Sequence, residues 1–215
     1  MINYVFVFFL PGSAGNFFSR CLSLAGEQAY GWVPADSTEI TLSANQKHQV
    51  YTYGQSSLYQ DWKRFEGQLV HYSTLTDHHN IPVDSVSVWS EHPRYQLLEQ
   101  NLAGTDNQQH VFYIDPGNDF EWVILNCLYK NSTIDVKWLQ EGQAMMKDTA
   151  IYKINLSNII TSWETTWLEV EKVYAIIKQQ CSNKELIQDL WQQWYLTTLK
   201  PEQFESFKRS IGFKL

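Results

Sequence analysis

The first 25 residues change from one hydrophobic pattern to another. Tyr4–Leu10 is a continuous apolar run rich in Val and Phe, which is typical of a strand buried on both faces of a parallel sheet. Small residues at Pro11–Ser13 interrupt the run. Apolar residues then recur at helical spacing, at Phe17, Phe18, Cys21, Leu22 and Ala25. The pattern therefore predicts a strand, a loop of small residues and a helix.

The same alternation returns further along the chain. Three more strands are predicted, at Val86–Trp89, His110–Ile114 and Ala150–Leu156. In the polar stretch between Tyr30 and Asn80, a helix around Leu58–Phe65 and a short strand around Leu69–Tyr72 are also expected. Pro93 stands where a helix would follow the strand at Val86–Trp89. After the strand at His110–Ile114, Asp115–Gly117 reads as a turn and Asn118–Tyr129 as a helix, with Asn118 and Glu121 spaced as a capping box.

The last quarter of the chain is predicted to be helical, from about residue 163 to residue 215. Two apolar stripes carry this prediction, one at Trp163, Trp167, Val170, Tyr174 and Ile177, the other at Leu186, Ile187, Leu190, Trp191 and Trp194. A short helix is expected near Gln203–Ser210. We expect one α/β domain over residues 1–215, a three-layer sandwich with a central, mostly parallel sheet.

Composition excludes some functions. The net charge is −7, and the sixteen basic residues form no Lys/Arg run, so a nonspecific nucleic-acid binder is not expected. The three cysteines, Cys21, Cys127 and Cys181, have neither zinc-site nor disulfide-framework spacing, which favours a reducing, cytoplasmic setting. The apolar N-terminal run lacks the basic flank of a signal peptide, and no run reaches the ~20 apolar residues of a membrane span. Oligomeric state is left open.

The loop after the first strand is a candidate anion site. A loop of small residues that leads into a helix exposes backbone N–H groups at the positive end of the helix dipole. The candidate residues are Gly12, Ser13, Ala14, Gly15, Asn16 and Phe17. Ser13 offers a hydroxyl, Asn16 offers an amide, and Arg20 on the helix could reach back toward a bound phosphate. The loop is neither a Walker A motif nor G-x-G-x-x-G.

A second candidate site follows the strand at Val86–Trp89. Glu91, His92 and Arg94 come just after this strand, and the ends of parallel strands meet at the same edge of a sheet as the first loop. His92 suits a general base near neutral pH. A surface histidine before a proline is the alternative interpretation.

The order of these segments resembles the sulfotransferase family. The resemblance is carried by "FFLPGSAGNFFSRCL", "VSVWSEHPRYQLLEQNL", "HVFYIDPGNDFEWVILNCLYKNS" and "AIYKINLSNII". Members of that family have a P-loop-like fold and transfer a sulfuryl group from 3′-phosphoadenylyl sulfate (PAPS) to an alcohol or amine.

The resemblance implies a role for each candidate site. Residues 12–17 would hold the 5′-phosphosulfate, and His92 would match the catalytic base. Asp115 and Pro116 would match the turn that precedes the 3′-phosphate site, and Asn126 or Ser132 would replace its binding serine. The segment between Tyr30 and Asn80, with its aromatic and amide side chains, would shape an acceptor pocket suited to a small molecule or a sugar.

The chain lacks the basic residues that the sulfotransferase family has at three positions of its donor site. The loop lysine falls near Ser13, Ser90 replaces the lysine two residues before His92, and no arginine stands in the turn at Asp115. Since a leaving phosphate needs a cation, Arg20 or Arg94 would have to supply it. The missing lysines keep a non-catalytic binding protein of the same fold open as an alternative, and a nucleotide-dependent phosphoryl transferase is a weaker one. His71, His78 and His79 are possible metal ligands, but only Asp77 and Asp84 stand near them as further ligands, so no metal site is predicted.

Overall fold

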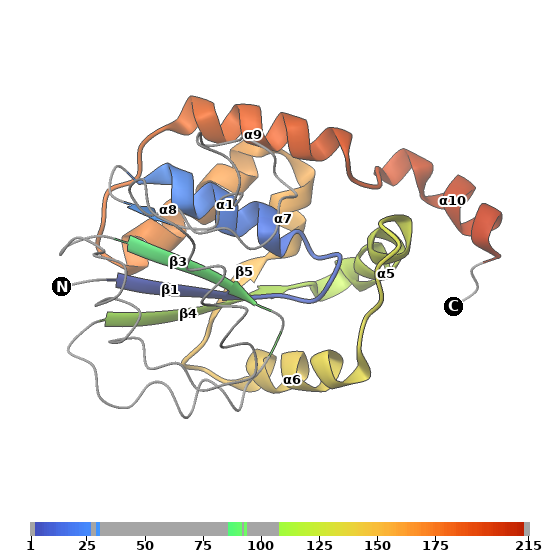
Figure 1. The fold of residues 1–215 in the computed structure, drawn as a ribbon, viewed down its shortest axis with the longest axis horizontal. Coiled ribbons are helices and arrows are strands. Elements are labelled where there is room, and N and C mark those ends of the chain that lie inside the picture. The colour runs from blue at the N-terminus through green and yellow to red at the C-terminus, as the bar shows by residue number, and fades with distance from the viewer. Residues whose placement is uncertain (1–2, 27–28, 31–85, 92, 94–107, 213–215) are drawn as a thin grey trace, which may run out of the picture.

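A parallel five-stranded sheet forms the centre of the computed structural model, which describes residues 3–26, 29–30, 86–91, 93 and 108–212. The strands are β1 (Asn3–Phe8), β2 (Ala29–Tyr30), β3 (Val86–Glu91), β4 (Gln108–Asp115) and β5 (Tyr152–Asn155). They lie in the order β2-β3-β1-β4-β5, and all four pairings are parallel (Figure 1). The predicted α/β class with a parallel sheet is confirmed.

β1 is the central strand, which explains why its sequence is apolar on both faces. Its last residue, Phe8, lies between Glu91 of β3 and Tyr113 of β4. Val5 and Val7 point to one face and Phe6 and Phe8 to the other, and all four are buried. A continuous apolar run is what a strand covered on both sides requires.

Helices cover both faces of this sheet in the described part of the chain. They are α1 (Gly15–Ala25), α5 (Phe120–Tyr129), α6 (Val136–Lys147), α7 (Leu156–Thr161), α8 (Trp163–Ile176), α9 (Lys184–Leu196) and α10 (Phe204–Ile211). Two 3₁₀ turns lie at Gly117–Asp119 and Pro201–Gln203. Figure 1 shows α1, α8 and α9 stacked on one side of the sheet and α6 on the other.

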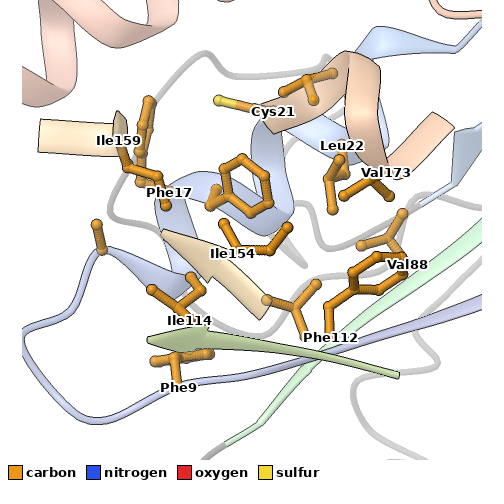
Figure 2. Close-up of a cluster of buried hydrophobic side chains, with 14 of the residues drawn as sticks. Phe9, Phe17, Cys21, Leu22, Val88, Phe112, Ile114, Ile154, Ile159 and Val173 are labelled. Atoms are coloured by element: carbon orange, nitrogen blue, oxygen red, sulfur yellow. The ribbon is translucent and has the colours of Figure 1, made fainter. Parts of the chain in front are cut away.

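The core fills the space between the sheet and the first of these helix layers. Figure 2 shows Phe17 and Leu22 of α1 directed into the same cluster as Val88, Phe112 and Ile154 of the sheet. Burial of this kind stabilises by about 25 cal/mol for each Å² of apolar surface removed from water. The Tyr174 hydroxyl donates a hydrogen bond to the Leu22 carbonyl (2.7 Å), which fastens α8 to α1.

The predicted C-terminal helices are present. Trp167 and Trp194 are buried, as a core interpretation of the tryptophans requires, whereas Trp163 and Trp191 are half-buried at the edge of the helix layer. The indole N–H of Trp191 donates a hydrogen bond to the Ile159 carbonyl (2.9 Å). The half-buried Trp191 therefore has a structural role, since its hydrogen bond joins α9 to α7.

The predicted capping box at Asn118 and Glu121 is wrong. The chain first makes a 3₁₀ turn, α5 begins only at Phe120, and its N-cap residue, Asp119, makes no side-chain capping bond. The Asp115 carboxylate accepts a hydrogen bond from the Gly117 N–H (2.8 Å) and starts this turn. Glu121 instead forms an ion pair with Lys208 of α10 at 2.6 Å.

Two helices had no counterpart in the sequence pattern. α6 buries only Gly142 and Met145, so its apolar face is too narrow to produce a clear helical period. α7 begins directly at the end of β5, where the Asn155 side chain accepts a hydrogen bond from the Ser157 N–H (3.0 Å). The predictions for residues 31–85 and for a helix after Pro93 lie outside the described residues.

Candidate functional site

The candidate site lies where the connections of the sheet change direction. β1 leads through α1 on one face toward β2, whereas β4 leads through α5 and α6 to β5, with α6 on the opposite face (Figure 1). β1 and β4 are neighbours in the sheet, and the chain leaves them toward opposite faces. The loops at their carboxyl ends therefore diverge and leave a space between them. In open α/β sheets this is the place where ligands bind.

The loop after β1 strongly favours glycine at position 12. Gly12 has a φ of +89°, and a Cβ atom there would lie 2.4 Å from the Val123 carbonyl oxygen of α5. Ala14 also adopts a left-handed conformation, with φ of 61°. Two successive bends of this kind turn the chain sharply out of β1 and into α1.

Gly15 is required by packing rather than by its backbone angles. A Cβ atom at Gly15 would lie 1.8 Å from the ring of Phe9. The Phe9 ring thus occupies the space that a side chain would fill, and α1 begins directly above it. The start of α1 therefore packs directly on Phe9, and both Phe9 and Gly15 line the cavity described below.

The N-terminus of α1 has no side-chain cap. The first backbone hydrogen bond of α1 itself runs from the Phe18 N–H to the Ala14 carbonyl (2.9 Å). The N–H groups that precede it carry the positive end of the helix dipole. Gly15, Asn16 and Phe17, which hold these groups, line a cavity.

This cavity has a volume of about 460 Å³, within the range of small-molecule sites. Its walls come from three parts of the chain that are distant in sequence: the loop with the start of α1, the end of α5, and the end of α9. The lining residues are Phe9, Pro11, Gly12, Ala14, Gly15, Asn16, Phe17, Lys130, Ser132, Trp194 and Thr197.

The end of α5 reaches the cavity through a regular helix stop. Asn131 has a φ of 52°, its N–H donates to the Leu128 carbonyl (2.9 Å), and the Ser132 N–H donates to the Cys127 carbonyl (2.9 Å). These are the two bonds of a Schellman motif. The stop places Lys130 and Ser132 beside the loop. The family resemblance had indicated Ser132 as a possible ligand-binding residue, whereas nothing in the sequence indicated Lys130.

Asn126 is not available to a ligand. Its amide nitrogen donates to the Gly12 carbonyl (2.7 Å), and its oxygen accepts from the Thr198 hydroxyl (3.0 Å) and the Leu199 N–H (3.3 Å). The residue is fully buried. Its role is to hold the loop, α5 and the segment after α9 together, not to stand for a ligand-binding serine.

The wall formed by α9 is aromatic. Trp194 stacks on Phe17 of α1, with ring centroids 4.3 Å apart and an interplanar angle of 11°. Trp122 of α5 secures the next segment, since its indole N–H donates to the Leu199 carbonyl (3.0 Å). Both tryptophans are buried, so this wall is rigid packing rather than an open stacking platform.

Two candidate ligand groups do not line the cavity. The Ser13 hydroxyl donates to the Leu10 carbonyl (2.6 Å) inside the turn and is buried, so it faces the end of β1 rather than a ligand. Arg20 is 3% exposed and lies outside the described lining. Burial lowers the pKa of the Arg20 guanidinium to about 10, an effect that the neighbouring Cys21 partly offsets.

His92 and Arg94 lie outside the described residues. The strand before them, β3, runs beside β1 and ends at Glu91, which is in register with Phe8. The predicted common edge for the ends of the two strands is therefore present. The roles of His92 and Arg94 stay predictions.

The acidic residues near the start of α5 are engaged locally. Asp115 caps its own turn and Glu121 pairs with Lys208. Burial raises the pKa of Asp119, and a hydrogen bond with Ser157 partly counteracts this. None of these three carboxylates is among the described residues that line the cavity.

Two further kinds of feature are absent from the described part of the chain. No group of three or more His, Cys, Asp or Glu side chains there could hold a metal ion. No described helix is long and apolar enough to cross a membrane. Comparisons with protein-family models, with curated proteins and with solved structures found no match to this chain.

Proposed function

We propose that this chain is a P-loop-like sulfotransferase that uses PAPS as donor and a hydroxyl or amine compound, such as a carbohydrate, as acceptor. The observation that carries the proposal is the glycine-dependent loop at residues 12–17, which opens the uncapped start of α1 onto a cavity of about 460 Å³. Such a helix start favours a phosphate or sulfate group. The sequence resemblance supplies the donor class.

The lining residues fit the anionic part of PAPS. Gly15 and Asn16 line the cavity at the uncapped start of α1, where backbone N–H groups would face a bound anion. The Asn16 amide and the Ser132 hydroxyl add neutral donors, and Lys130 adds a positive charge. The loop lysine of the family is absent, so these groups would have to orient and stabilise the phosphosulfate.

The proposed reaction moves one sulfuryl group. An S–O (or S–N) bond to the acceptor forms as the S–O bond to the 5′-phosphate of PAPS breaks, leaving adenosine 3′,5′-bisphosphate and a sulfated acceptor. His92 would take the proton of the acceptor, as its place after β3 and the resemblance suggest. The N–H groups of α1 would stabilise the charge that develops on the departing phosphate.

Isothermal titration calorimetry with adenosine 3′,5′-bisphosphate tests the donor site. We expect saturable binding by the full chain, which is lost when Gly15 is replaced by Val, since the added side chain would displace Phe9 and cover the loop. Absence of binding by the unaltered protein would remove the donor assignment. For the base, His92→Ala should reduce sulfuryl transfer from labelled PAPS by at least about 100-fold with little change in donor affinity.

A non-catalytic binding protein of this fold is the second candidate. It is favoured by the burial of Arg20 and by the internal hydrogen bond of Ser13, which withdraw two of the groups expected to assist departure of the phosphate. Such a protein would bind the bisphosphate but would transfer no label to a panel of alcohols, amines and oligosaccharides. Measurable transfer to any of them excludes it.

A further inference from the structure

We infer that Lys130, at the end of α5, supplies the positive charge that the loop itself lacks and so sets the affinity of the site for an anionic ligand. This inference rests on the proposed function, because it takes the cavity beside α1 as the place of a phosphate or sulfate group. Among the described residues that line the cavity, Lys130 is the only one with a charged side chain.

The position of Lys130 follows from the contact between α5 and the loop. Asn126 donates its hydrogen bond to the Gly12 carbonyl at 2.7 Å, and Lys130 stands four residues later, on the same side of α5. Val123 of the same helix lies against Gly12. The face of α5 that touches the loop therefore continues to Lys130.

The helix stop holds this lysine in place. Lys130 is the C-cap residue of α5, and its N–H donates to the Asn126 carbonyl (3.1 Å). The left-handed Asn131 and the bond from the Ser132 N–H to Cys127 then turn the chain past the cavity. Lys130 and Ser132 thus flank one bend of the backbone, opposite the start of α1.

The charge distribution gives this lysine its importance. The chain carries a net charge of −7, so an anion approaching it needs a local cation. Lys208, another described basic residue near α5, does not line the cavity and forms ion pairs with Glu121 and Glu205 at 2.6 and 3.1 Å. Lys130 and the dipole of α1 then act on the same ligand from two sides of one cavity.

The test compares Lys130→Met, Lys130→Arg and Lys137→Met by calorimetry. The probes are adenosine 3′,5′-bisphosphate and inorganic pyrophosphate. Lys137 is an exposed lysine of α6 that is not part of the cavity, so its replacement removes the same charge elsewhere. Thermal unfolding of each variant verifies the fold, and Lys130→Gln takes the place of Lys130→Met if that variant is unfolded.

We expect Lys130→Met to weaken binding of the bisphosphate about 10- to 100-fold, the usual effect of losing one charge-assisted hydrogen bond. Lys130→Arg should restore most of the affinity, and Lys137→Met should leave it within about twofold. The affinity of the unaltered protein should also fall more steeply with added salt than that of Lys130→Met, because the lost interaction is ionic.

The other outcomes separate this inference from the proposed function. Equal binding of the bisphosphate by Lys130→Met and the unaltered protein overturns the role of Lys130 and leaves the donor site intact. Pyrophosphate binding that depends on Lys130, without binding of the bisphosphate, supports the anion site and removes the PAPS assignment. If the unaltered protein binds neither probe, both are overturned.

Discussion

The amide nitrogen of Asn126 donates a hydrogen bond to the carbonyl oxygen of Gly12 at 2.7 Å, which ties the middle of α5 to the loop after the central strand. The amide oxygen of the same side chain accepts hydrogen bonds from Thr198 and Leu199. One buried side chain thus fixes the loop, one helix and the segment after α9. The shape of the cavity depends on this three-way junction.

Asn126→Ala should lower the free energy of unfolding by at least about 2 kcal/mol, because it leaves three polar groups, one on the loop and two on the segment after α9, without their partner. Denaturant unfolding at neutral pH measures the change. Asn118→Ala is the control. It removes an exposed asparagine from the 3₁₀ turn before α5 and should change the free energy of unfolding by less than about 0.5 kcal/mol. Similar effects of the two substitutions would contradict the role assigned to Asn126.

Gly12→Ala should be more destabilising than Gly212→Ala, although both glycines have a positive φ (89° and 64°). Each substitution carries a backbone cost of about 1 kcal/mol. Only at Gly12 does the new Cβ meet another atom, the Val123 carbonyl oxygen, whereas the space at Gly212 is open. The clash should add about 1–3 kcal/mol in denaturant unfolding. An equal loss of stability in the two variants would show that α5 does not press on the loop.

The buried Tyr174 hydroxyl predicts a loss of stability in alkali. Burial raises the pKa of Tyr174 above its ordinary value of 10.0, so the folded protein holds this proton more tightly than the unfolded chain does. The resulting stability is present below about pH 10 and decreases as pH rises above it, by at most about 1.4 kcal/mol for each pH unit.

Tyr174→Phe removes this titration together with the hydrogen bond to Leu22. The variant should be less stable than the unaltered protein by about 1 kcal/mol at pH 7. The difference should narrow between pH 10 and pH 11.5, because only the unaltered protein loses the tyrosine contribution. Denaturant unfolding across this range measures it, and a difference that stays constant over the range argues against the prediction.

Asn16→Asp should change stability and ligand binding in opposite directions. A carboxylate in the first turn of α1, which has no acidic residue there, stabilises a helix N-terminus by about 0.3–1 kcal/mol. The same charge in the cavity should repel adenosine 3′,5′-bisphosphate and weaken its binding at least about tenfold. Val136→Asp, in the first turn of α6, is the control: it should leave binding unchanged. Tighter binding by Asn16→Asp would mean that the cavity does not receive an anion.

The sheet and the loop could be predicted because their signals are local. The apolar run of β1 reflects burial on both faces, and the small residues that follow it reflect a bend that strongly favours glycine at position 12. The burial of Arg20 was not predicted, because the residue was expected beside a bound phosphate, although its position on the helix carries a signal for it. Arg20 stands three residues after Phe17 and four before Leu24, on a face of α1 that is covered by other elements.

Lys130 and the internal bond of Ser13 could not be found in this way. Lys130 belongs to the site only because α5 folds back onto the loop, and that contact joins residues more than one hundred positions apart. The Ser13 hydroxyl could donate its hydrogen bond either to a ligand or to the carbonyl three residues before it. The tight turn brings the Leu10 carbonyl within reach, and the hydroxyl donates to it. The apolar face of α6 was too narrow to mark it as a helix.

The central place of β1 has a consequence for the way the protein is made. β1 is synthesised well before β3 and β4, the two strands that pair with its edges. Until they pair with it, its run of Val and Phe is an open strand with two unpaired edges, the kind of segment that associates with other chains. Pairing over such sequence distances is slow. In a newly made chain, β1 is therefore a segment at which association with other chains is expected until β3 and β4 pair with it.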